Sequence, residues 1–70
     1  MRYISAREKA MSFIDKNIIG EKITTDGVEF VYEKVIAGIM TNCAASPKLA
    51  KECLDAQLSY HDFEVKDGKF

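Results

Sequence analysis

Two cysteines and one histidine are the residues of this 70-residue chain that could most readily take part in catalysis or metal binding. Cys43 and Cys53 lie too far apart for a structural zinc site, which pairs its cysteines about two to four residues apart and needs four ligands. Closing such a site with His61 would require borrowing an aspartate. The spacing therefore predicts no metal ion and no cofactor.

Cysteine chemistry is the remaining enzymatic hypothesis. Cys43 could act as a nucleophile if His61 served as its base, and a helix start close by would lower the pKa of the thiol. A cysteine at the end of an apolar helical stripe, however, usually behaves as a small hydrophobic residue. We therefore expect that this chain is not an enzyme.

The charge balance argues against several other classes of function. Ten lysines and arginines stand against eleven acidic residues, which leaves a net charge of −1. A protein that depends on phosphate contacts, or a polybasic peptide on a membrane surface, needs clustered cations that this chain lacks. The longest apolar run, 35–40, is far shorter than the ~20 residues of a membrane span. Glu8 and Asp15 argue against a signal peptide, so we expect a cytoplasmic protein with reduced cysteines.

The first element that would position any site is a helix over 5–19. Ser5 and Glu8 form a capping box, and charged residues follow on one side of the helix. Gly20 comes where a left-handed residue commonly ends a helix. The apolar residues recur at helical spacing on the opposite side: Ala6, Ala10, Phe13, Ile14 and Ile18.

The segment 21–32 fits two structures. Asp26 and Gly27 are typical of a hairpin turn, which would give a hairpin at 22–32 and an α+β fold. Asp26 and Glu29 equally form a capping box, and the apolar residues from Val28 to Ile39 recur at helical spacing. We favour a helix over 27–44 and keep the hairpin as the alternative.

A third helix is predicted over 47–59, since Ser46 is a favourable cap and Pro47 suits the first helical position. Its apolar residues, Leu54 and Leu58 among them, cover an arc of about 200°, which is wider than a helix needs when it packs against one core. Either the two preceding helices cradle this helix, or part of it meets another chain.

These elements predict a single all-α domain, 1–70, made of three helices and a short extended C-terminal tail. In the tail, 60–70, Phe63 and Val65 alternate with acidic residues before a turn at Asp67 and Gly68. We expect the tail to pair with 23–25, to fray, or to add to the sheet edge of a partner.

The size of the chain favours association, because so short a domain has a marginal core and gains stability by burying more surface against a partner. Aromatic side chains and methionine are enriched in protein contact surfaces. We predict a non-enzymatic protein-binding module that forms a homodimer through the helix at 47–59 and acts as a regulator or inhibitor of a larger protein. The predicted contact residues are Phe30, Met40, Leu54, Leu58, Tyr60 and Phe63.

The alternative function is a small DNA-binding transcriptional regulator with a helix-turn-helix at 35–58. Its recognition helix would carry Lys48 and Lys51, offset by Glu52 and Asp55. A helix without net charge gains little from counterion release in a DNA groove. Nucleic acid is therefore the less favoured partner.

Overall fold

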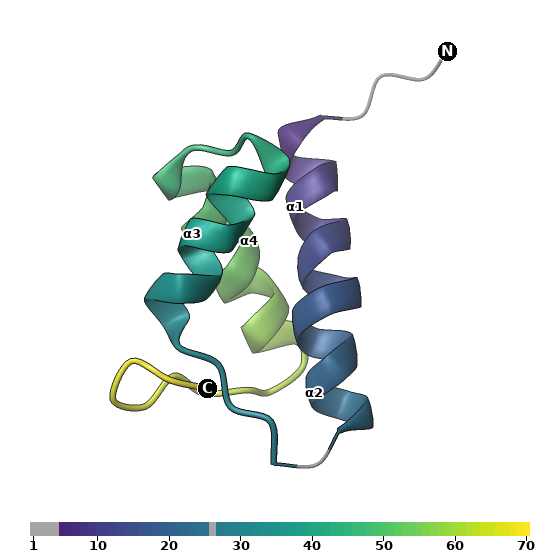
Figure 1. Cartoon of the computed structure of the whole chain (residues 1–70), viewed down its shortest axis with the longest axis vertical. Coiled ribbons are helices and arrows are strands. Elements are labelled where there is room, and N and C mark those ends of the chain that lie inside the picture. Colours follow the sequence, from purple (N-terminus) through teal and green to yellow (C-terminus); the bar gives the residue numbers. More distant parts are fainter. Residues whose placement is uncertain (1–4, 26) are drawn as a thin grey trace.

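The computed structural model describes residues 5–25 and 27–70, and this part of the chain forms a bundle of three helical segments (Figure 1). The first segment is continuous from α1 (Ala6–Ile14) through a π-helical turn, η1 (Asp15–Ile19), to α2 (Gly20–Thr24). The other two are α3 (Tyr32–Cys43) and α4 (Pro47–Tyr60). Because the described residues contain no β-strand, the prediction of an all-α domain with three helices is confirmed.

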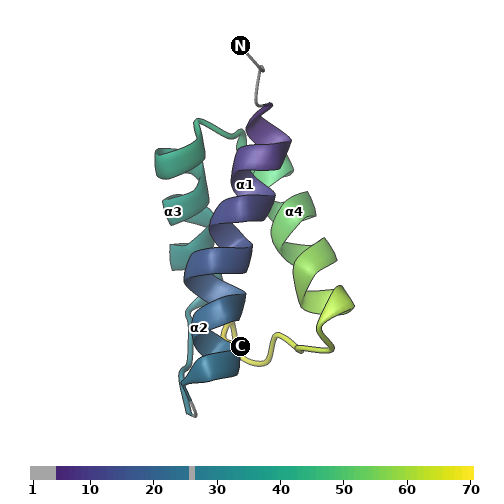
Figure 2. The same ribbon diagram turned by 90° about the vertical axis from the view of Figure 1, so that its right-hand side faces the viewer.

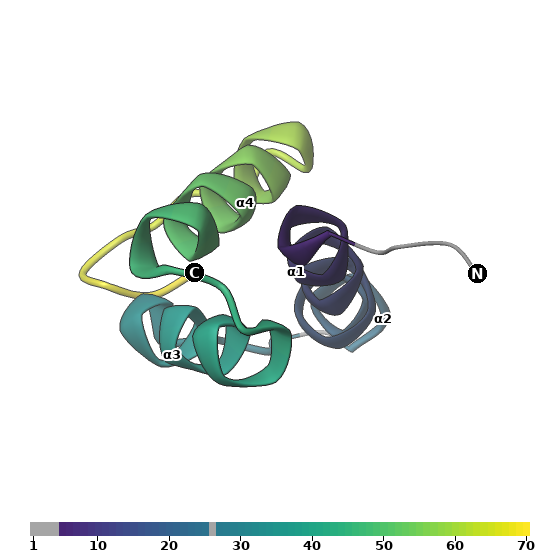
Figure 3. The same cartoon turned by 90° about the horizontal axis from the view of Figure 1, so that it is seen from above.

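The core lies where the three segments face one another, as Figure 3 shows from above. Apolar residues at helical spacing on each segment meet there, and burial of each large side chain contributes about 1.5–3 kcal/mol. The largest fully buried side chains come from all three segments: Ile14, Ile19, Ile39, Cys53 and Leu54.

The first helix begins as predicted but continues past its predicted end. The Ser5 hydroxyl accepts a hydrogen bond from the Glu8 N–H at 3.2 Å, so the predicted cap is confirmed. The prediction that Gly20 ends the helix is wrong. Gly20 keeps right-handed helical backbone angles (φ −58°) and donates its N–H to the Asp15 carbonyl, five residues back.

The wider turn of η1 depends on the absence of a side chain at Gly20. A Cβ at this position would lie 2.8 Å from the Asp15 carbonyl oxygen, which is closer than real Cβ atoms approach an oxygen. The π-helical turn inserts one residue into the helix, so that Ile18 and Ile19 are both buried although they are adjacent in sequence.

The second helix begins later than predicted. Helix α3 starts at Tyr32 rather than at residue 27, and the alternative hairpin at 22–32 is also wrong because residues 22–24 belong to α2. The backbone of Phe30 exchanges two hydrogen bonds with Phe70, of 2.8 and 2.9 Å. This long-range pairing overrides the helical spacing of the residues before Tyr32. Asp26, on which both predictions drew, lies outside the described residues.

Helix α4 matches its predicted bounds to within one residue. Ala44 adopts left-handed backbone angles (φ 52°) and ends α3. Ser46 then accepts a hydrogen bond from the Leu49 N–H at 3.2 Å, and Pro47 opens the helix. Each of these signals is local, which is why the sequence sufficed to predict them.

The C-terminal segment, 61–70, crosses the lower end of the bundle (Figures 1 and 2). Asp67 and Gly68 have positive φ angles, 52° and 74°, and turn the chain so that Phe70 returns to Phe30. The prediction of an extended tail is confirmed, but the predicted pairing with 23–25 is wrong because the bridge partner is Val31. Phe70 is only 7% exposed and is therefore part of the core.

Lys22 joins this segment to α2. Its ammonium group donates to the Val28 carbonyl at 2.7 Å and lies 5.6 Å from the centre of the Phe63 ring and 5.7 Å from that of Phe70. Cation–π contacts of this kind contribute roughly 0.5–1 kcal/mol at exposed sites. The end of the bundle is thus closed by contacts from residues far apart in the sequence.

The wide apolar arc of α4 is covered by the chain itself. Leu54 is fully buried and Leu58 is 4% exposed, with α1 on one side of α4 and α3 on the other (Figure 3). The Phe63 N–H donates to the Leu58 carbonyl, so the C-terminal segment folds back on the end of α4. The prediction that Leu54 and Leu58 are available to another chain is therefore wrong, because the neighbouring helices cradle α4.

Candidate protein-binding site

The predicted contact residues do not form one surface. Leu54 and Leu58 lie in the core. Phe30 and Phe63 are half-buried at the end of the bundle that the C-terminal segment closes, and the Phe30 ring contacts that of Phe70 with centroids 5.7 Å apart. These four side chains are thus occupied by the fold, which leaves the other two predicted residues as candidates for binding.

Met40 lies in a groove between α3 and α4. The groove has a volume of about 300 Å³. Its floor is apolar, since Ile36 is 7% exposed and Met40 is half-buried against the core. The residues that line it are Tyr32, Glu33, Ile36, Ala37, Met40 and Lys51.

Glu33 and Lys51 give this groove one charge of each sign. Both residues are exposed, and neither takes part in an ion pair within the described residues. The groove therefore combines an apolar floor with two opposite charges that the described part of the chain leaves unpaired.

A hydrogen bond fixes the end of the α3–α4 groove. The Tyr32 hydroxyl donates to Oδ1 of Asp55 at 2.7 Å. Burial, then the hydrogen bond and charge of Asp55, raise the pKa of Tyr32 to about 12. The phenol stays protonated at neutral pH and links the two helices, so it is not suited to act as a base.

Tyr60 lies in a second hollow, between α1 and α4, of about 320 Å³. It is 81% exposed, and its ring packs edge-on against that of His61 with centroids 5.0 Å apart. The other lining residues, Met11, Ala56 and Gln57, carry no charge. This hollow can contribute apolar contact area, but it offers no charge that would select one partner over another.

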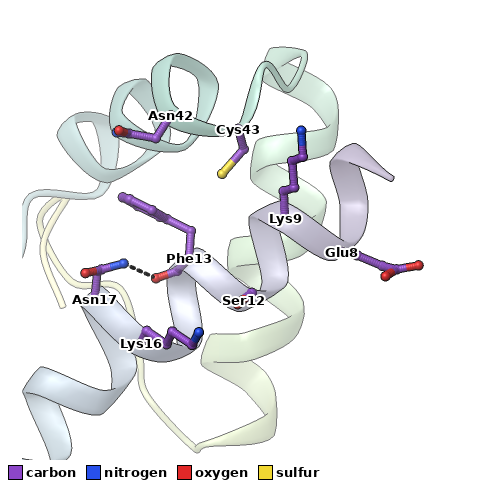
Figure 4. Close-up of a pocket in the computed structure, with 8 residues that line it drawn as sticks. All are labelled: Glu8, Lys9, Ser12, Phe13, Lys16, Asn17, Asn42 and Cys43. Carbon is purple, nitrogen blue, oxygen red and sulfur yellow. Dashed lines mark hydrogen bonds between the residues drawn. The ribbon is translucent and has the colours of Figure 1, made fainter. Parts of the chain in front are cut away.

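A third and larger hollow, of about 460 Å³, lies between α1 and the C-terminal end of α3 (Figure 4). The Phe13 ring extends from α1 toward α3, and Lys9 rises beside Cys43. Lys16, in η1, lines the same hollow seven residues further along the first helical segment. The remaining lining residues are Glu8, Ser12, Asn17 and Asn42.

This third hollow, which forms a groove between α1 and α3, was not predicted from the sequence, because the charged residues on that side of the first helix gave no sign that another helix lies beside them. The signal that could have found it is the seven-residue spacing of Lys9 and Lys16, with Phe13 between them. That spacing puts two cations on one helix face beside a large apolar side chain.

Cys43 and His61, the pair first considered for catalysis, do not come together. Cys43 and Cys53 are buried, and burial raises the pKa of both thiols, although the Lys9 charge partly offsets this for Cys43. Cys43 precedes α4 and His61 follows it, so about 21 Å of helix separates them along the axis. Within 5–25 and 27–70, no three His, Cys, Asp or Glu side chains gather closely enough to hold a metal ion.

The exposed face of α4 carries no excess of positive charge. Lys48, Lys51, Glu52 and Asp55 are all exposed, and Glu52 accepts from Arg7 at 3.0 Å. Binding to DNA draws much of its affinity from phosphate neutralisation by clustered cations. The helix-turn-helix hypothesis therefore stays a hypothesis that no feature of this face favours.

None of the described helices is both long and apolar enough to cross a bilayer. Comparison with known protein families, with curated proteins and with solved structures returned no match for this chain.

Proposed function

We propose that this chain is a non-enzymatic protein-binding module that pairs with a second copy of itself through the groove between α3 and α4, and that it regulates or inhibits a larger protein. The observation that carries the proposal is the composition of this groove: an apolar floor at Ile36 and Met40, edged by Glu33 and Lys51. Methionine adapts its shape to a facing surface and is common in such contacts.

The two charges make the groove complementary to itself. In a two-fold symmetric dimer each contact occurs twice, because the same patch is used by both copies. Glu33 of one copy facing Lys51 of the other would form two equivalent ion pairs on either side of the Met40 side chains. A groove with charges of one sign would instead repel its own copy.

The exposed face of α3 can extend the contact beyond the groove. A stable complex buries about 800 Å² on each partner, which is more than a groove of this size supplies alone. Ala37, which lines the groove, and Thr41, one turn further along α3, are exposed and carry small side chains, so a second helix can approach closely there. The role of α4 in this dimer differs from that predicted from the sequence, because it contributes Lys51 rather than Leu54 and Leu58.

Charge exchange tests the dimer. We expect the wild type to dimerise between micromolar and millimolar concentrations, as measured by analytical ultracentrifugation. Glu33→Lys and Lys51→Glu should each be monomeric, whereas an equimolar mixture of the two variants should form a heterodimer and the double variant should recover the homodimer. Lys48→Glu, an exposed change on α4 outside the groove, serves as the control and should leave the dimer intact.

Two results would overturn the proposal. A wild type that stays monomeric at millimolar concentration has no self-association to explain. A dimer that tolerates both charge reversals uses some other surface. Both variants alter exposed side chains, so loss of the dimer would not arise from loss of the fold, and circular dichroism verifies this.

A further inference from the structure

The groove between α1 and α3 has a different character from the dimer groove. Lys9 and Lys16 are exposed along its rim, and neither forms an ion pair within the part of the chain that the structure describes. Between them the half-buried Phe13 ring and the buried Cys43 thiol supply an apolar floor (Figure 4). Glu8 also lines the groove, but its side chain points away from the floor.

We propose that this groove binds an acidic amphipathic helix of a partner protein. The inference deepens the proposed function, since it names the class of partner that the module recognises. It uses a different face of the bundle from the α3–α4 groove, so helix binding and dimerisation can be tested separately.

The spacing of the two lysines favours a helix as the ligand. Lys9 lies in α1 and Lys16 in η1, seven residues further along the continuous first segment, which corresponds to about 10.5 Å along the helix axis. Acidic residues at positions i and i+7 of a partner helix have the same separation, so a helix lying along the groove can pair with both lysines at once. A small anion could reach only one of them.

The apolar floor favours a peptide over a nucleic acid. A helix with acidic residues at i and i+7 presents positions i+3 and i+4 on the same face, where an apolar side chain would meet the Phe13 ring. A phosphate backbone offers no apolar group to this floor. The volume of about 460 Å³ is large enough for two or three side chains.

Two asparagines add hydrogen-bond acceptors to the groove. The Asn17 amide donates to the Phe13 carbonyl at 3.2 Å, and the Asn42 amide donates to the Gly38 carbonyl at 2.8 Å. These bonds hold each side chain against its own helix. Neither Oδ1 atom accepts a hydrogen bond within the described residues, so both are left for polar groups of the bound helix.

The test uses fluorescein-labelled synthetic helical peptides and fluorescence anisotropy. The probe carries glutamates at i and i+7 with leucines at i+3 and i+4. A matched peptide moves the second glutamate to i+5, which keeps the net charge but changes the face, and a third replaces both glutamates with lysine. The proteins are the wild type, Lys9→Glu/Lys16→Glu, and the control Lys34→Glu/Lys48→Glu, which reverses two exposed lysines outside the groove.

We expect the probe to bind the wild type saturably and the i+5 peptide to bind at least threefold more weakly. Lys9→Glu/Lys16→Glu should weaken probe binding at least tenfold and should bind the lysine peptide instead, whereas the control should change the affinity less than threefold. The tenfold loss follows because two attractive charge pairs become repulsive.

Three outcomes would overturn the inference: no saturable binding of the probe up to millimolar concentration, equal losses in the two double variants, or displacement of the probe by a DNA duplex of equal charge concentration. Ultracentrifugation of Lys9→Glu/Lys16→Glu separates this inference from the proposed function. If Lys9→Glu/Lys16→Glu no longer binds the probe but still dimerises, the dimer proposal is unaffected. If Glu33→Lys and Lys51→Glu are monomeric but still bind the probe, the helix-binding inference is unaffected.

Discussion

Replacing Phe70 with alanine removes the side chain through which the C-terminal segment enters the core. The Phe70 residue is 7% exposed, its ring lies 5.7 Å from that of Phe30, and the Lys22 ammonium group lies 5.7 Å from its centre. Truncation of a buried phenylalanine costs about 3–5 kcal/mol. We expect about 3 kcal/mol, the low end of that range, because Phe70 sits at the edge of the core rather than at its centre.

That loss is large for a domain of this size. At roughly 0.05–0.15 kcal/mol per residue, the free energy of unfolding of the chain is about 4–10 kcal/mol. A loss of about 3 kcal/mol should lower the melting temperature by roughly 12–24 °C, measured by circular dichroism. Tyr60→Ala is the matched control, since an aromatic side chain that is 81% exposed should change stability by less than about 0.5 kcal/mol. If Phe70→Ala has the same melting temperature as the wild type, the C-terminal segment is not part of the core.

Three further predictions concern single side chains. Gly20→Ala should lower the free energy of unfolding, measured with urea, by about 1–3 kcal/mol, because the added Cβ would lie 2.8 Å from the Asp15 carbonyl oxygen. Alanine is intrinsically the better helix former, so a gain in stability would contradict the role of glycine in η1. The pKa of Tyr32 is raised to about 12, so folding favours its protonated phenol, and the contribution of Tyr32 to stability should be complete below about pH 10 and lost as the pH rises toward 12. Asp55→Asn should lower the pKa of Tyr32 only in part, since burial is the larger cause of the shift. Phenolate absorbance during a pH titration measures the pKa in the wild type and in the variant. Cys43 and Cys53 should react with an alkylating reagent at neutral pH at least tenfold more slowly in the native than in the unfolded protein, and equal rates would refute their burial.

The elements that the sequence predicted correctly are those fixed by neighbouring residues. Ser5 and Ser46 cap their helices with hydrogen bonds to the N–H groups three residues on, and Pro47 opens α4, as their spacing indicated. Each signal involves atoms within one helical turn, so no knowledge of the rest of the fold was needed. This explains why the helix at 47–59 was predicted to within one residue.

The errors arose where distant residues decide the local structure. The start of α3 depends on the pairing of Phe30 with Phe70, which no pattern near residue 30 reveals. Gly20 is an ambiguous signal for a related reason: glycine suits both a left-handed helix end and a close approach to a carbonyl, and the burial of Ile18 and Ile19 selects the second.

The candidate site was predicted in part only. Periodicity measured the width of the apolar arc on α4, but it could not say whether a neighbouring helix or another chain covers it. Met40 and Tyr60 lie outside the deep core, whereas Leu54 and Leu58 lie within it. Whether Met40 and Tyr60 contact a partner stays a prediction.

The burial of Leu54 and Leu58 changes where binding can occur on this molecule. In this bundle, apolar surface is accessible in the grooves between neighbouring helices as well as at single exposed side chains such as Ile23, and the side chains on the rim of a groove determine which partner it can accept. The α3–α4 groove has charges of both signs on its rim and is therefore complementary to a second copy of itself. The α1–α3 groove has two cations two turns apart and is therefore complementary to an acidic helix. Under the two proposals, partner choice is set by Glu33, Lys51, Lys9 and Lys16. All four are exposed, so each can be replaced with little effect on the fold.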